Sequence, residues 1–132
     1  EETEDFLNAR LAALEQEIRR LPQRDLYEQA ERISKAYVTD RKFRLMFLRA
    51  EYHDPQKAAV RLVRFLEGKV RFFGPDILAR NLCLSDLDDD DLAFLKSGIL
   101  QVMPARDRAG RAIIGDFNMQ RKGSFAWKSV DN

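Results

Sequence analysis

The sequence predicts a mainly α-helical protein: a bundle of four to five helices, then a β-hairpin and an extended C-terminal arm. Through most of the chain, apolar residues recur at spacings of three and four, which places them on one face of each helix. After Gly98, two short apolar segments flank a polar turn, a pattern typical of a hairpin. We therefore divide the chain into a helical domain at 1–98, a hairpin at 99–117 and an extended tail at 118–132.

The first helix is expected over residues 4–20. Thr3 is a suitable N-cap residue, and Leu21-Pro22 ends the helix because proline disfavours the α conformation in the residue before it. Its apolar face is formed by Phe6, Leu7, Leu11, Leu14 and Ile18.

Two further helices are expected before residue 52. One runs from Asp25 to Val38, and the next begins at a cap on Thr39 or Asp40 and ends near Glu51. The inner face of the first is assigned to Leu26, Ala30, Ile33 and Tyr37, and that of the second to Phe43, Met46, Phe47 and Ala50.

The fourth helix, Pro55 to Phe73, has the clearest pattern. Asp54 suits the N-cap position, Pro55 suits the first helical position, and Gly74-Pro75 ends the helix. One side is apolar, made by Ala59, Leu62, Val63, Leu66, Val70 and Phe73 and widened by Ala58, Phe65 and Phe72. The other side is basic and carries Lys57, Arg61, Arg64 and Arg71.

This basic face lies in a basic segment of an almost neutral chain. Residues 41–71 contain nine basic and three acidic side chains, whereas the whole chain has a net charge of +1. The simpler interpretation is a solvated helix face. The alternative is a docking surface for phosphate headgroups or an acidic partner, with Lys57, Arg61, Arg64 and Arg71 as its contacts.

The acidic segment 85–95 allows a calcium interpretation, which its details disfavour. Asp86, Asp88 and Asp90 match the opening spacing of an EF-hand loop, but Asp91 replaces the turn glycine and Ser97 the final Glu. A helix capped by Ser85, with acids in its first turn, explains the segment better.

The hairpin is expected from strands at 99–103 and 111–117 around the turn 107–110. An isolated hairpin is marginally stable, so this one must pair with something. The candidate docking residues for a protein partner are Ile113, Phe117, Phe125 and Trp127. Phe125 and Trp127 lie either on the helices or in a partner, and the sequence does not decide between these.

Composition excludes several classes of function. One Cys rules out an internal disulfide and fits a reducing, intracellular compartment, and one His with one Cys excludes a structural zinc site. No run approaches the roughly 18 to 20 apolar residues of a membrane span. His53 is the one candidate general base and is interpreted as a loop histidine, while Cys83, between two leucines, is interpreted as a buried thiol.

We therefore expect no enzymatic activity and no cofactor. Nucleic-acid binding is also not expected, because the basic face lacks interleaved aromatic residues and the net charge is close to zero.

Two motifs resemble the CRAL-TRIO family of phosphatidylinositol- and retinoid-transfer proteins. The stretch FLRAEYHDPQKAA resembles the family's N-terminal helical segment, with matches at Phe47, Leu48, Arg49, Ala50, Asp54, Lys57 and Ala58. The stretch DRAGRAI at 107–113 is similar to the family's first β-hairpin. The resemblance covers residues 25–117, with His53 in place of a usual aromatic residue and Ala112 in place of a common proline.

The resemblance implies a non-enzymatic lipid-binding or lipid-transfer protein, represented by its front half. The family's lipid pocket follows the position of residue 117, so no lipid-contacting residue can be carried over. The chain is most similar to uncharacterised algal members, which permits a plastid location, at the periphery of a membrane. The alternative is a structural or assembly subunit, docked through its hairpin and arm on a larger complex, membrane-bound complexes included.

Overall fold

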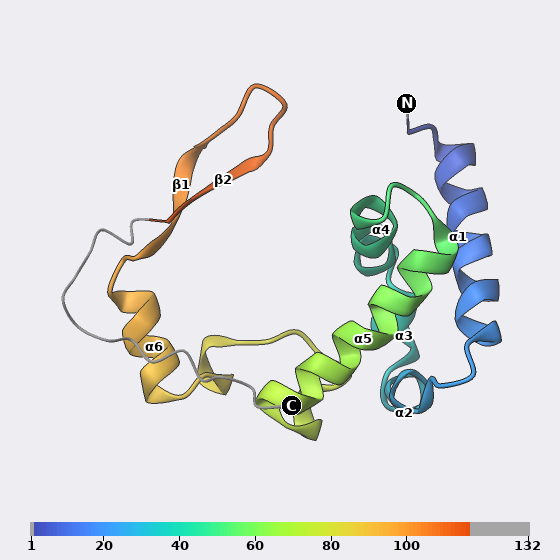
Figure 1. Cartoon of the computed structure of the whole chain (residues 1–132), viewed down its shortest axis with the longest axis horizontal. Coiled ribbons are helices and arrows are strands. Elements are labelled where there is room, and N and C mark those ends of the chain that lie inside the picture. The colour runs from blue at the N-terminus through green and yellow to red at the C-terminus, as the bar shows by residue number, and fades with distance from the viewer. Residues whose placement is uncertain (1, 117–132) are drawn as a thin grey trace. The chain divides into compact units, whose positions relative to one another are not determined.

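The computed structural model of the chain describes residues 2–116. It is mainly helical and ends in a two-stranded antiparallel hairpin, which confirms the predicted fold class (Figure 1). The described residues form two compact units, with the boundary between Asp86 and Leu87. The predicted extended tail, residues 118–132, lies outside the described residues.

The first unit is a helical bundle built around its longest helix. Its elements are the α-helices α1 (Glu4–Arg20), α2 (Asp25–Ile33), α3 (Lys35–Thr39), α4 (Arg41–Ala50) and α5 (Pro55–Phe73), with the short 3₁₀ helices η1 (Pro75–Ile77) and η2 (Leu84–Asp86). Helix α5 packs against α1, α2 and α4, and α1 also contacts α4 (Figure 1).

Local capping sets the helix boundaries. Thr3 Oγ1 accepts the backbone N–H of Phe6 at 3.2 Å, Asp40 accepts that of Phe43 at 2.7 Å, and Asp54 accepts that of Gln56 at 3.0 Å. The predicted caps of α1 and α5 are confirmed, and Asp40 rather than Thr39 caps α4. Helix α5 ends at Gly74, whose φ of 88° favours glycine.

The core follows the predicted faces of α1 and α5. Leu14 and Ile18 of α1 are fully buried, as are Leu62 and Leu66 of α5. The other members come from all five helices and from η1 and its C-cap: Leu7, Tyr27, Ala30, Val38, Leu45, Phe47, Leu48, Ala58, Ala59, Val63, Ile77 and Leu78.

The prediction of a single helix from Asp25 to Val38 is wrong, because the helix is interrupted at Ser34. Ser34 adopts extended dihedrals, φ −151° and ψ 92°, and its hydroxyl caps α3 by accepting the N–H of Tyr37. The break shifts the helical register, so Ile33 is 61% exposed while Val38 is buried. The predicted face also omitted Tyr27, which is fully buried.

The predicted inner face of α4 is also partly wrong. Phe47 is buried and Phe43 half-buried, but Met46 and Ala50 are exposed. Leu45 and Leu48 are buried in their place. The reason is that α4 packs against both α1 and α5, so more than one of its sides is covered.

Three other expectations are corrected. Phe72 of α5 is 63% exposed instead of widening the core face. Cys83 is exposed, because residues 80–84 run over the surface and its leucine neighbours are exposed too. Asp88, and not Ser85, caps the acidic helix, since its carboxylate accepts the N–H of Asp91 at 2.8 Å.

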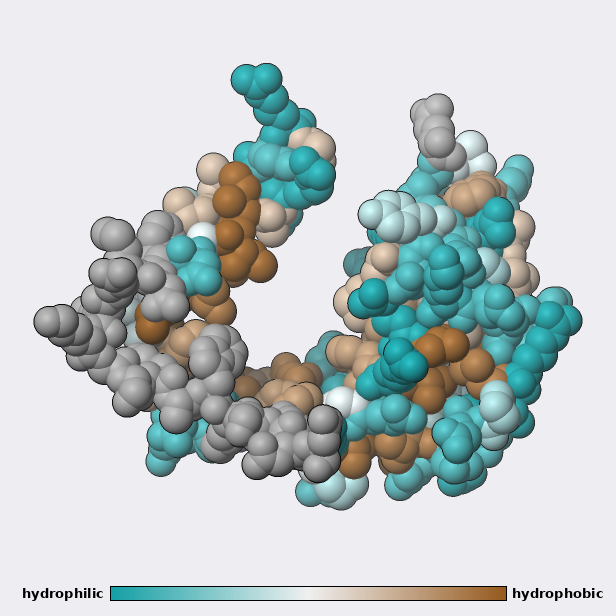
Figure 2. Space-filling model, viewed as in Figure 1, coloured by the Kyte–Doolittle hydropathy of each residue, from teal (hydrophilic) through white to brown (hydrophobic). Residues whose placement is uncertain are grey.

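The second unit contains helix α6 (Asp89–Lys96) and strands β1 (Leu100–Arg106) and β2 (Ala112–Asp116). Val102 pairs with Ile114, and the register shifts between Val102 and Arg106, where Pro104 removes a backbone donor. Asp107 closes the turn by accepting the N–H groups of Ala109 and Arg111. Hydrophobic residues lie at the surface of this hairpin (Figure 2), where Val102 is 72% exposed and Ile114 67%.

Candidate functional site

The α4–α5 connection places the basic face of α5 next to α4. Tyr52 and His53 both adopt left-handed conformations, with φ of 52° and 62°. The His53 N–H donates to the carbonyl of Leu48 at 2.7 Å, which closes the last turn of α4, and Asp54 then caps α5. This reversal brings the C-terminal half of α4 alongside the N-terminal half of α5.

His53 lies in this turn, as predicted, with its ring directed to the N-terminal segment. Its Nε2 is 2.9 Å from Oε1 of Glu2, and its ring makes an edge contact with Phe6 at 5.1 Å between centroids. The Nδ1 atom is buried and has no hydrogen-bond partner within residues 2–116. These contacts join the α4–α5 turn to the N-terminal segment, and they include no hydroxyl or thiol.

The four predicted surface contacts lie on α5 and are all exposed. Lys57 is 3.6 Å from Asp54, and Arg61 forms an ion pair with Glu51. Arg64 and Arg71 have no hydrogen bond or ion pair within residues 2–116. Two of the four cations on this face are therefore available to an anion without breaking an existing pair.

Three of these cations border a groove between α4 and α5. The groove has a volume of about 810 Å³. Helix α4 and the residue after it supply Met46, Phe47, Ala50 and Glu51, and α5 supplies Gln56, Lys57, Val60, Arg61, Arg64 and Phe65. Arg71 lies outside the groove, so the structure brings together three of the four predicted contacts and separates the fourth.

The floor of the groove is apolar and rests on a cluster of aromatic rings. Phe47 and Phe65 make an edge contact at 5.3 Å between centroids, and each also contacts Phe43. Phe47 is only 3% exposed, whereas Met46 is 49% exposed and Phe65 37%. The groove therefore joins a supported apolar floor to a cationic rim, which suits an amphipathic anionic ligand.

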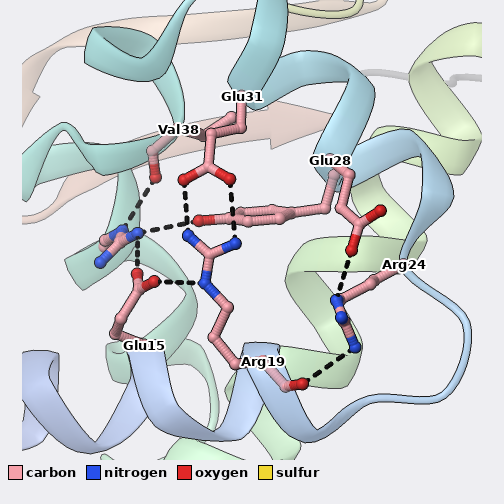
Figure 3. Close-up of polar contacts among 8 residues, drawn as sticks. Glu15, Arg19, Arg24, Glu28, Glu31 and Val38 are labelled. Carbon is pink, nitrogen blue, oxygen red and sulfur yellow. Dashed lines mark hydrogen bonds and ion pairs between the residues drawn. The ribbon is translucent and has the colours of Figure 1, made fainter.

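A polar network holds α1, α2 and α4 together (Figure 3). Arg44 is 7% exposed and donates to the Val38 carbonyl at 2.8 Å, to Glu15 at 2.5 Å and to the Tyr27 hydroxyl at 2.9 Å. Arg19 of α1 donates to both carboxylate oxygens of Glu31 in α2, at 2.6 and 2.9 Å. Both arginines are satisfied within the protein, so this network is structural.

The network sets the pKa of Glu15. Partial burial of this carboxyl raises its pKa, but hydrogen bonds from Arg44 and Arg19 outweigh that effect and hold the pKa below its ordinary value.

Burial alone raises the pKa of the Tyr37 hydroxyl.

Lys69 is a second buried cation, 3% exposed, on the core side of α5. Its ammonium donates to the Tyr37 hydroxyl at 2.8 Å and to the carbonyls of Leu78 and Arg80 at 3.4 and 2.5 Å. Burial, followed by the charge of Arg80, lowers the pKa of Lys69. These bonds fasten the segment after α5 to the bundle.

The other candidates concern metal ligands, membrane spans and the docking residues of the hairpin. Within residues 2–116, no three His, Cys, Asp or Glu side chains are grouped to hold a metal ion, and no helix has the length and apolar character needed to cross a membrane. Ile113 of β2 is 41% exposed. The other predicted docking residues, Phe117, Phe125 and Trp127, lie outside the described residues.

Sequence reasoning missed one wall of the groove and both buried cations. The helical spacing assigns Met46 and Ala50 to the core, but the two residues lie on one face of α4, two positions on either side of Leu48, and this face fits a partly exposed edge equally well. Arg44 stands among the apolar residues of α4, and such a placement is the signal that could have indicated a buried, paired arginine.

Comparison with family models, with curated proteins and with solved structures finds no significant match. The CRAL-TRIO resemblance therefore stays an interpretation of the two motifs.

Proposed function

We propose that this chain is a non-enzymatic, CRAL-TRIO-like lipid-binding or lipid-transfer protein whose helical unit attaches to anionic membrane surfaces. The observation that carries the proposal is the exposed basic face of α5, on which Arg64 and Arg71 have no partner within residues 2–116. The plastid location at the periphery of a membrane belongs to the same proposal and rests on the resemblance.

The basic face has the composition of a peripheral membrane contact. The Lys57 side chain is 70% exposed and that of Arg61 56%. Phe72, next to Arg71, is 63% exposed and offers an apolar group at the same surface. Each Lys or Arg near an anionic bilayer contributes roughly 1 kcal/mol, an attraction that salt screens.

Sedimentation with vesicles tests this proposal. The chain is expected to bind phosphatidylserine-containing vesicles, to bind pure phosphatidylcholine vesicles far more weakly, and to dissociate as salt is added. The double variant Arg64→Gln/Arg71→Gln is expected to weaken binding roughly 30-fold, since two contacts of about 1 kcal/mol are lost.

The matched control removes two exposed cations elsewhere on the same unit. Arg32→Gln/Lys35→Gln has the same net charge as the test variant, but its changes lie at the end of α2 and the start of α3. If the two double variants bind equally, the attraction comes from total charge and the proposed face is wrong. Equal binding of anionic and neutral vesicles also contradicts the proposal.

A second candidate function is a structural or assembly subunit that docks through its hairpin. It is favoured by the exposure of Val102 and Ile114, which form a cross-strand apolar pair with no cover within residues 2–116. Amide exchange of the isolated chain tests it. Slow exchange throughout β1 and β2 in a monomer contradicts the idea, because a covered hairpin needs no partner.

A further inference from the structure

We propose that the α4–α5 groove binds one single-chain lipid with an anionic phosphate head, the acyl chain on the apolar floor and the phosphate at Arg64. This inference rests on the proposed function but goes further, because it names a bound lipid molecule rather than a membrane surface. The ligand class is a lysophosphatidate-like lipid monophosphate.

The shape of the groove suits one chain. Its volume of about 810 Å³ lies within the range of about 300–1,000 Å³ typical of small-molecule sites. It runs between two packed helices, whose axes are typically about 8–10 Å apart, so the apolar floor is narrow and elongated. A floor of this width suits a single acyl chain better than two chains side by side.

The floor of the groove has apolar surface that is exposed to solvent in the free protein. Met46 and Phe65 are 49% and 37% exposed, and Val60, which also lines the groove, is half-buried. Phe47 beneath them is held by ring contacts to Phe43 and Phe65, so the floor is formed before a ligand arrives. Covering this surface with an acyl chain removes it from water without reordering the core.

The cationic rim of the groove favours a lipid with an anionic headgroup. Arg64 has no partner within residues 2–116, and a guanidinium can bind a phosphate through two parallel hydrogen bonds. Arg61 is paired with Glu51 and Lys57 lies 3.6 Å from Asp54, so Arg64 is the rim cation without a partner within residues 2–116, and the other two add positive charge beside it. The excess of positive charge favours a phosphate monoester over a zwitterionic choline head.

Calorimetry with palmitoyl lysophosphatidic acid, below the concentration at which it forms micelles, tests the proposal. Palmitoyl lysophosphatidylcholine has the same chain and a zwitterionic head, and inorganic phosphate has the head without a chain. We expect lysophosphatidic acid to bind at least about tenfold more tightly than lysophosphatidylcholine, because the quaternary ammonium of the choline head cancels the phosphate charge and is repelled by the cationic rim. Inorganic phosphate is expected to bind too weakly to detect.

Two pairs of variants locate the site. Ala50→Trp places a large ring in the groove at an exposed position, and Ala12→Trp places one on the exposed side of α1, outside the groove. Arg64→Gln and Arg71→Gln remove equivalent exposed cations from α5, of which only Arg64 borders the groove. We expect Ala50→Trp to abolish lysophosphatidic acid binding and Arg64→Gln to weaken it about tenfold, with both controls unchanged.

The outcomes separate this inference from the proposed function. If anionic vesicles bind but lysophosphatidic acid does not, or if Ala50→Trp binds it as the wild type does, the groove proposal is overturned while the surface proposal stands. If lysophosphatidic acid binds in the groove and vesicles do not bind, the reverse holds. An acidic amphipathic peptide that binds the groove in place of the lipid also overturns the inference and makes the groove a protein-docking site.

Discussion

The two compact units differ in where their apolar side chains lie. In the helical unit up to Asp86, Leu14 of α1 and Leu62 and Leu66 of α5 are fully buried, and the buried Arg44 is paired with Glu15. Within residues 87–116, no side chain is fully covered, and Val102 and Ile114 are mostly exposed. The helical unit thus has a core of its own, whereas the hairpin unit has apolar faces without a core. Shortening an apolar side chain should therefore lower the free energy of unfolding more in the helical unit than in the hairpin unit.

The largest contrast is expected at Leu66. Leu66→Ala should destabilise the helical unit by roughly 2–5 kcal/mol, because the side chain is fully buried and its removal leaves a cavity. Urea denaturation followed by helical circular dichroism measures the effect. Leu95→Ala in α6, where the side chain is 46% exposed, is the matched control and should change stability little.

The buried network gives the second contrast. Arg44→Ala removes the donor to Glu15, to the Tyr27 hydroxyl and to the Val38 carbonyl, and should cost about 2–3 kcal/mol, reduced by the partial exposure of Glu15.

Arg20→Ala is the control for this substitution in the same denaturation experiment. Arg20 pairs with Glu17 on the surface, and its side chain is 70% exposed, so its loss should cost less than about 1 kcal/mol. Equal effects of the two substitutions would mean that the buried contacts of Arg44 stabilise the protein no more than a surface ion pair does.

These expectations show which interactions the sequence could reveal. The caps Thr3 and Asp54 act within four residues of their partners, so their local pattern was sufficient to place the ends of α1 and α5. The Arg44–Glu15 contact spans 29 residues, and no local pattern indicates it. The break at Ser34 was missed because the apolar spacing continues across it.

The candidate site was predictable to a similar degree. The basic stripe of α5 follows from helical spacing alone, and all four cations are exposed as that spacing requires. The groove needs a second wall from α4, and the left-handed turn at Tyr52 and His53 that aligns this wall is unusual for residues other than glycine. Spacing within one helix cannot supply the position of another.

The third prediction concerns acid. The pKa of Glu15 is below its ordinary value of 4.5 in the folded protein, so the unfolded chain binds the proton more readily. Its contribution to stability is therefore present above that pH and is lost as the pH falls below it. Stability of Glu15→Gln, measured by urea denaturation from neutral pH to pH values below 4.5, should fall less steeply than that of the wild type.

Acid dependence should persist in Glu15→Gln at lower pH. Hydrogen bonds from Arg80, and then from the Cys83 N–H, hold the pKa of Asp86 at about 2, against an ordinary value of 3.8. The contribution of Asp86 is thus retained to lower pH than that of an unpaired aspartate. Identical acid profiles of wild type and Glu15→Gln would show that the Arg44 and Arg19 contacts to Glu15 are not maintained in solution.

The smallest effect is expected at Ile114, and its size decides how the two units are compared. Ile114→Ala removes a side chain that is 67% exposed, so it should change the free energy of unfolding of the isolated chain by less than about 0.5 kcal/mol. Urea denaturation and amide exchange of β1 and β2 measure it. A loss as large as that of Leu66→Ala would mean that Ile114 is covered in the monomer. The contrast between a self-contained helical unit and an uncovered hairpin would then be wrong, and the case for a protein partner at the hairpin would lose its main support.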